Sequence, residues 1–240
     1  MFPKKNSLPQ NLWFAFFVIA LAAAWVPAAE KPAPAGTVLV ADKGKLVIQL
    51  DGKTVGHEEF EIAPAEGGWV AKGTTEIKPD QGASQRITGT MVLQPDGAPI
   101  SYEWTSQAEK KNGAHILFAN GVAKITLEMQ GASRPFEQDL TFNTTHVAVL
   151  DNNLYHQYAV LARVYDWSKR GEQTFPVLIP QELTPGSITV NYTGASNDKG
   201  KSYEGLRVTT SDLEVLLVLD SSHRLMRLEV PSAKVAVVRE

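Results

Sequence analysis

Histidines and glutamates are the side chains of this chain whose spacing could support metal or acid–base chemistry. His57-Glu58-Glu59 begins like the H-E-x-x-H motif, in which two histidines on a helix bind zinc and the glutamate is the base. Position 61 is glutamate, and the segment alternates like a strand. The chain has no cysteine, and its other histidines do not stand at metal-ligand spacing. These are His115, His146, His156 and His223. We therefore expect no metal site and no cofactor.

The sequence offers little support for nucleophilic or paired-carboxylate catalysis. Two serine segments, 131–135 and 194–198, lack the final glycine of G-x-S-x-G and are interpreted as turns. Glycosidases need two carboxylates and have no short motif. The candidates all lie on expected strands: Glu58, Glu59, Glu61, Glu76, Glu103 and Glu128. Most occupy the polar positions of alternating strands, which normally face solvent. We expect no catalytic residue, and a glycan-acting enzyme is the least favoured alternative.

Large apolar side chains form the more suggestive group. They recur at alternate positions of successive expected strands and on one expected helix. Burial in a core explains any one of them, but an apolar groove between sheet and helix would use the same residues, because small-molecule pockets are mostly apolar. The groove hypothesis names ten residues: Trp69, Met91, Tyr102, Trp104, Phe118, Met129, Tyr158, Leu161, Tyr165 and Trp167.

The elements that must position these residues are mostly short strands. From Thr37, β-type segments recur every ten to twelve residues or so between turn signals, a spacing typical of an all-β sandwich or barrel. The clearest hairpin is 114–129, centred on Asn120-Gly121, a pair that tolerates the positive φ of a type I′ turn. Strands are also expected at 37–41 and 174–179, and Pro176 makes the latter an edge strand or a loop.

One segment, Asp151 to Lys169, has helical rather than strand periodicity. Its apolar residues form two rows: Leu154, Tyr158, Leu161 and Tyr165, and beside them Val160, Val164 and Trp167. Asp151 or Asn152 could cap its start, and Gly171 follows its end. A helix apolar around most of its circumference is largely buried. We therefore expect one helix in the concave face of a curved sheet.

The first thirty residues predict export. Lys4 and Lys5 precede an apolar run of 13 residues, 12–24, and small residues follow at 26–29. This is the order of a secretory signal peptide. A membrane anchor is the alternative, but a helix needs about 20 apolar residues to span a bilayer. The expected organisation is a signal peptide at 1–29, a disordered Pro/Ala-rich lead-in at 30–36, and a single β-rich domain at 37–240, with no transmembrane segment after cleavage.

Charge limits the partners. The chain has 23 basic and 26 acidic residues, a formal net charge of −3, and no polybasic run. Nucleic acids bind through clustered Lys and Arg, so we expect no nucleic-acid partner. The lack of cysteine excludes disulfides in an exported chain. Together these features favour a periplasmic or secreted protein of the bacterial cell envelope.

Three stretches resemble exported bacterial families of unknown function. They are 51–56 with Phe60, Ile62 and Trp69; the segment 151–190; and the ending around Leu219-Asp220, Arg224-Leu225 and Val230-Pro231. These families are often likened to the LolA/LolB lipoprotein carriers. The resemblance implies a half-open β-barrel closed by helices over an apolar cavity. The sequence predicts one helix where the carriers have several.

The expected fold is therefore mainly all-β: a curved antiparallel sheet or half-open β-barrel, with one central helix packed on the concave face. Two β-sandwich domains divided near Leu150 are the alternative. The expected function is binding of a lipid-like or other apolar ligand, or chaperoning of an envelope component. The expected partners are a lipid or apolar small molecule, or an envelope protein. A structural or protein-interaction module without a ligand is the alternative.

Overall fold

The computed structural model describes residues 36–78, 83–108 and 110–240, which belong to one compact unit of the chain, Lys31–Glu240. In this part of the chain fifteen strands, one α-helix and two short 3₁₀ helices follow one another. The strands are β1 Asp42–Leu50, β2 Lys53–Ala65, β3 Gly68–Ile77, β4 Gln85–Leu93, β5 Pro99–Gln107, β6 Lys111–Ala119, β7 Val122–Met129, β8 Phe136–Thr141, β9 Ala148–Val149, β10 Gln173–Ile179, β11 Thr184–Asp198, β12 Lys201–Thr209, β13 Glu214–Asp220, β14 Leu225–Val230 and β15 Val235–Arg239. The helices are α1 His156–Val164, η1 Pro180–Glu182 and η2 Pro231–Ala233.

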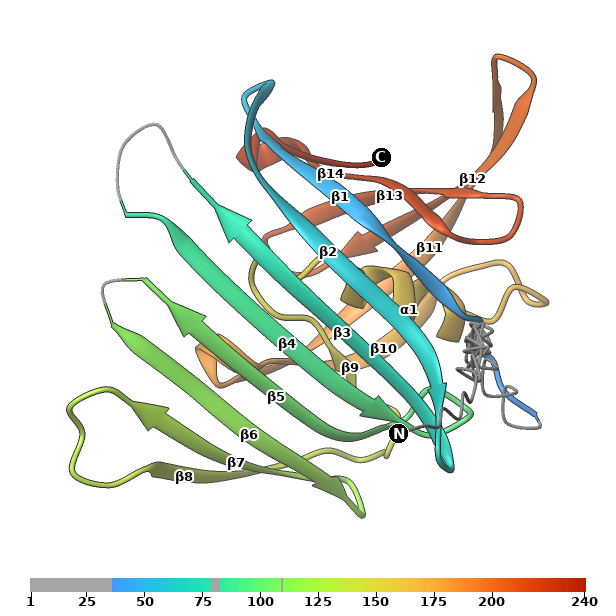
Figure 1. Ribbon diagram of the computed structural model, residues 1–240. Helices are drawn as coiled ribbons and strands as arrows, with labels where there is room; N and C mark the ends of the chain where they lie inside the picture. The colour runs from blue at the N-terminus through green and yellow to red at the C-terminus, as the bar shows by residue number, and fades with distance from the viewer. Residues whose placement is uncertain (1–35, 79–82, 109) are drawn as a thin grey trace, which may run out of the picture. The chain divides into compact units, whose positions relative to one another are not determined.

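All fifteen strands form a single curved sheet, in the order β8-β7-β6-β5-β4-β3-β2-β1-β15-β14-β13-β12-β11-β10-β9. Every pairing is antiparallel except that of β9 with β10. Nearly all strands therefore pair with their neighbours in sequence, as expected for connections made by tight turns. The exception is the pairing of β1 with β15, which joins the β1–β8 half of the sheet to the β9–β15 half (Figure 1).

The core lies between the sheet and α1, which contacts β3 in one half of the sheet and β14 in the other (Figure 1). Alternation decides which side chains are buried. On β13, for example, Val215, Leu217 and Leu219 are buried while the residues between them are half-buried. On β3 the buried positions include Trp69 and Ala71. The expected fold is confirmed, and the single sheet excludes two sandwiches divided near Leu150.

Local predictions had mixed outcomes. The Asn120-Gly121 hairpin is confirmed as β6–β7, with both residues at positive φ (53° and 75°). The segment around Pro176 is strand β10, which pairs over its full length with β11 but with only two residues of β9. The strand expected at 37–41 is wrong, because the first strand begins at Asp42. The predicted signal peptide and most of the lead-in lie outside the described residues.

The helix is shorter than predicted, spanning nine residues instead of nineteen. Tyr165 leaves helical geometry (φ −61°, ψ 130°), and its hydroxyl donates to the Gly171 carbonyl at 2.6 Å and accepts from Gly171 N at 2.8 Å. At the other end, neither Asp151 nor Asn152 is the N-cap, a position taken by Tyr155. Side-chain contacts outside the helix therefore set both of its ends.

A buried ion pair joins the first and last strands. Arg239 on β15 donates to both carboxylate oxygens of Asp42 on β1, at 2.6 and 3.1 Å, and the two side chains are only 10% and 4% exposed. Arg239 also donates to the Lys43 carbonyl. A side chain at Gly44 would place its Cβ 2.9 Å from the guanidinium, so glycine leaves room for it. This bidentate pair fixes the two halves of the sheet to each other.

Candidate functional site

Helix α1 is held to the sheet at its N-terminus by a buried glutamate. One carboxylate oxygen of Glu58 on β2 accepts hydrogen bonds from Tyr155 N (2.8 Å) and His156 N (3.1 Å), and the other lies 2.5 Å from His156 Nδ1. Both side chains are fully buried. The positive end of the helix dipole and the free N–H groups stabilise an anion at this point. Gly73 on β3 has no side chain here, and a Cβ would collide with Glu58 and His156.

The burial of Glu58 differs from the expectation for most strand glutamates. Glu58 alternates with Phe60 and Ile62, which are buried on the same face of β2, whereas the other five candidate glutamates are exposed or half-buried. Strand parity could therefore have identified Glu58 as an inward-facing carboxylate.

A second buried carboxylate, Asp151, organises the turn that precedes α1. Tyr102 on β5 donates to Asp151 Oδ2 at 2.9 Å, and the backbone N–H groups of Asn152 and Gln181 donate to Oδ1 at 3.1 and 2.9 Å. Burial raises the pKa of Asp151 to about 6, although these hydrogen bonds oppose the rise. Burial, and then the neighbouring Asp151, raise the pKa of Tyr102 well above its usual range.

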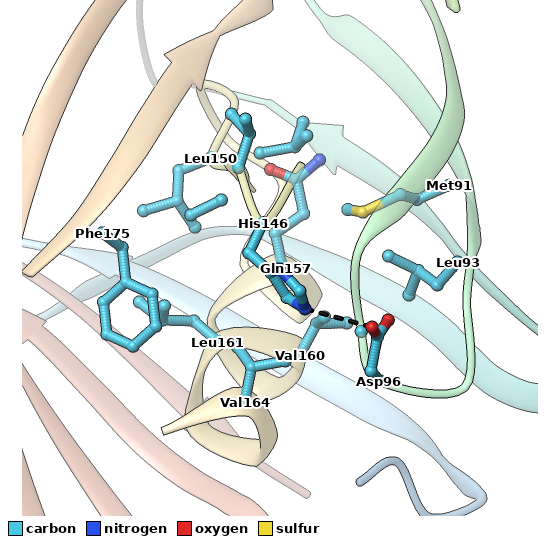
Figure 2. A pocket seen from close by; sticks show the side chains of 14 residues that line it. Met91, Leu93, Asp96, His146, Leu150, Gln157, Val160, Leu161, Val164 and Phe175 are labelled. Carbon is cyan, nitrogen blue, oxygen red and sulfur yellow. Dashed lines mark hydrogen bonds and ion pairs between the residues drawn. The ribbon is translucent and has the colours of Figure 1, made fainter. Parts of the chain in front are cut away.

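An apolar cavity of about 80 Å³ lies beside the helix. It is bounded by α1, by β4, by the segment that leads into and through β9, and by β10 (Figure 2). Its lining residues are Met91, Leu93, Asp96, Gly97, His146, Val147, Ala148, Val149, Leu150, Gln157, Val160, Leu161, Val164 and Phe175.

Two polar features interrupt this apolar lining. Asp96 and His146 form an exposed pair at 3.1 Å, drawn as the dashed line in Figure 2. Gln157 projects from the first turn of α1 and is 1% exposed. Its Oε1 accepts a hydrogen bond from Asp151 N at 2.5 Å, which connects the cavity to the buried Asp151. Glu58, His156 and Asp151 themselves are not among the residues that line the cavity.

Of the ten residues in the groove hypothesis, Met91 and Leu161 line this cavity. Trp69, Tyr102, Trp104 and Tyr165 are buried in the core, and Tyr158 is half-buried against it. Phe118 lies at a separate hollow of about 390 Å³ near the β6–β7 turn. The remaining two lie elsewhere again: Met129 is 48% exposed on β7, and Trp167 stacks on His223 with ring centroids 3.7 Å apart.

Sequence reasoning missed several lining residues. Val160 and Val164 belong to the second predicted apolar row of the helix, and Gln157 lies three residues before Val160, so helical spacing places it on the same face. Phe175 and the segment 146–150 come from loops and edge strands, where periodicity gives no information about which side chains meet.

Within the described residues no group of His, Cys, Asp or Glu is arranged to hold a metal ion. In the same part of the chain, no helix is long and apolar enough to cross a membrane.

Comparisons with known proteins identify the fold. No protein-family model and no curated protein matches the sequence. Among solved structures, the chain is similar to a β-barrel-like protein of a domain of unknown function, DUF1849, from Brucella abortus, with 11% identity, a TM-score of 0.55, and 84% of this chain and 95% of that one covered. A DUF1089 family protein from Pseudomonas aeruginosa has 11% identity, 87% and 95% coverage and a TM-score of 0.46. At such identity the first match shows a shared fold alone, that of β-barrel-like domains of unknown function.

Proposed function

We propose that this protein is exported to the bacterial envelope and there binds a lipid-like or other apolar ligand in the cavity beside α1. The observation that supports this function most directly is the cavity itself, which is lined by apolar side chains of α1, β4 and β10. Such a concave apolar site with a few polar groups is typical of small-molecule binding. The predicted signal peptide and the resemblance to LolA/LolB-like half-barrels favour the same function.

The size of the cavity limits what can enter it. A cavity of about 150 Å³ is enough to bind benzene, and this one measures about 80 Å³. We therefore expect it to receive the end of an apolar chain or a group of a few heavy atoms. The remainder of a longer ligand would extend out of the cavity into solvent beside the exposed Asp96–His146 pair.

A protein-interaction module or chaperone is the second candidate, favoured by the free edge of the sheet. Strand β8 pairs with β7 and has no partner on its other side among the described residues. Phe136 on β8 and Met129 on β7 are 45% and 48% exposed. Edge strands with exposed apolar residues can pair with another chain.

Native mass spectrometry of the full chain, expressed with its leader and purified from a bacterial periplasm, tests the proposal. We expect the processed protein to carry a bound mass that organic extraction removes. Protein that stays in the cytoplasm would contradict the export part. A clean apo mass, with no uptake of added palmitate or phosphatidylethanolamine, would contradict ligand binding and favour the interaction module.

A cavity-filling variant then locates the site. Val160→Phe places four more carbon atoms at the wall of the cavity and should reduce the bound fraction at least tenfold. Val238→Phe, on the half-buried face of β15 away from the cavity, is the matched control and should retain the ligand. Equal retention by a folded Val160→Phe protein would place the ligand elsewhere.

A further inference from the structure

The Gln157 amide is the buried polar group of the cavity whose hydrogen bonding is incomplete. Its Oε1 accepts from Asp151 N at 2.5 Å, which fixes the orientation of the amide. Its Nε2 is buried and has no hydrogen-bond partner among the described residues. The amide lies near the Tyr102 hydroxyl and slightly opposes the rise in the pKa of that phenol, but the two groups do not meet the geometry of a hydrogen bond.

A buried N–H donor without an acceptor is costly and therefore rare in folded proteins. The surroundings of this one are apolar: Met91 and Leu150 line the same cavity, and Figure 2 shows the Gln157 side chain among these side chains. A ligand that enters the cavity is well placed to supply the missing acceptor.

We infer, on the basis of the proposed function, that the buried end of the ligand carries a neutral hydrogen-bond acceptor, a carbonyl or hydroxyl oxygen, which Gln157 Nε2 binds. The ligand class is thus an apolar chain with an ester, amide, ketone or alcohol group at the end that enters the protein.

The charges around the cavity disfavour an anionic head at this depth. None of the lining residues is Lys or Arg. The one basic side chain, His146, is exposed and paired with Asp96. Asp151 donates its backbone N–H to the Gln157 amide, so the negative charge of the Asp151 carboxylate also lies near the buried end of the cavity. A free carboxylate there would lose its hydration without a compensating cation.

The test compares three small probes that share a six-carbon chain: hexane, 2-hexanone and hexanoate at pH 7.5. Each probe is titrated into the processed protein, and binding is followed by changes in NMR chemical shifts. We expect hexane and 2-hexanone to bind and hexanoate to bind at least tenfold more weakly than 2-hexanone. The Gln157 side-chain N–H resonances should move downfield with 2-hexanone and stay in place with hexane.

A substitution removes the amide while keeping the length of the side chain. Gln157→Met should weaken 2-hexanone binding about tenfold and leave hexane binding unchanged or tighter. Hexane binding thus reports an intact cavity in the variant. Gln138→Met, on β8 and outside the cavity, is the matched control. If Gln157→Met does not fold, the amide resonances of the unmodified protein still decide the question.

The outcomes separate this inference from the function on which it rests. If neither hexane nor 2-hexanone binds, both the apolar site and the inference are wrong. If both bind while the Gln157 resonances stay in place and Gln157→Met changes neither affinity, the apolar site stands and the acceptor contact is overturned. Hexanoate binding as tightly as 2-hexanone would overturn the neutral character of the head.

Discussion

At the scale of single residues, the core contains carboxylates that are stabilised by hydrogen bonds from the protein, among them those of Glu58 and Asp151. Asp151 is 5% exposed and accepts hydrogen bonds from a phenol and two backbone N–H groups. These bonds only partly offset its burial, and its pKa is raised from 3.8 to about 6. The folded protein therefore binds this proton more tightly than the unfolded chain does.

The pH dependence of stability follows from this difference. Between pH 3.8 and about 6, Asp151 is protonated more fully in the folded state than in the unfolded state, so its contribution to the free energy of unfolding decreases as pH rises. The contribution of Asp151 is fully present below pH 3.8 and is lost as pH rises through about 6, a change of about 3 kcal/mol.

Asp151→Asn should remove this pH dependence, because the amide does not titrate and its oxygen can still accept from Asn152 N and Gln181 N. Urea unfolding at pH 4, 5, 6 and 7.5 measures the effect. Asp139→Asn, at an exposed position of β8, is the control and should leave the pH profile unchanged. An Asp151→Asn profile parallel to that of the unmodified protein would show that Asp151 titrates normally.

At the scale of elements, local sequence patterns predicted which strands pair and where the helix lies. They did not predict where the helix begins and ends, because distant side chains determine those positions. Alternation indicated the strands, and Asn120-Gly121 located the β6–β7 turn, since both signals depend on neighbouring residues. The rows of apolar residues on α1 gave its buried faces. The ends of α1 depend on contacts with other segments. At the N-terminus, Glu58, 98 residues away in sequence, accepts a hydrogen bond from His156 N; at the C-terminus, the Tyr165 hydroxyl donates to the Gly171 carbonyl.

The candidate site was harder to predict for the same reason. Seven of the ten residues named for the groove are aromatic, and four of these seven, Trp69, Tyr102, Trp104 and Tyr165, pack in the core. The cavity is instead lined largely by aliphatic residues and one glutamine, contributed by four separate segments. Their meeting depends on how the sheet curves around α1, which no single segment encodes.

The β1–β15 pairing should depend strongly on its ion pair. Arg239→Met leaves the Asp42 carboxylate buried without its cation, and the free energy of unfolding should fall by about 3–5 kcal/mol. Chemical unfolding measures this loss. Arg227→Met breaks an exposed pair with Glu229 and should cost about 1 kcal/mol or less.

The double variant Asp42→Asn/Arg239→Met distinguishes the buried charge from lost packing. It leaves no unpaired charge, so we expect part of the lost stability to return. A double variant as unstable as Arg239→Met alone would assign the loss to packing around the guanidinium.

At the scale of the whole molecule, the sheet consists of two runs of strands, β1–β8 and β9–β15, in which each strand pairs with its neighbour in sequence. Contacts within each run are local, whereas Leu46 and Arg239, which face each other across β1 and β15, are far apart in sequence. Local pairings form with a small loss of chain entropy, and distant pairings form slowly. The two runs also share one core, because Glu58 and Tyr102 from the first bond to Asp151–His156 in the second.

This topology has a consequence for the covalent chain. The segment 142–147 connects the runs and forms no ladder, so a break between Asn143 and Thr144 would leave every strand pairing intact. We expect the two fragments, expressed together, to assemble into a nicked protein that copurifies through β1 and β15, with Arg239→Met in the second fragment weakening the assembly. Fragments that stay separate would contradict this expectation. Assembly would mean that the molecule behaves as two complementary subunits joined by one connecting segment, and that new chain ends or inserted domains are tolerated between Asn143 and Thr144, away from the cavity-lining His146 and Val147.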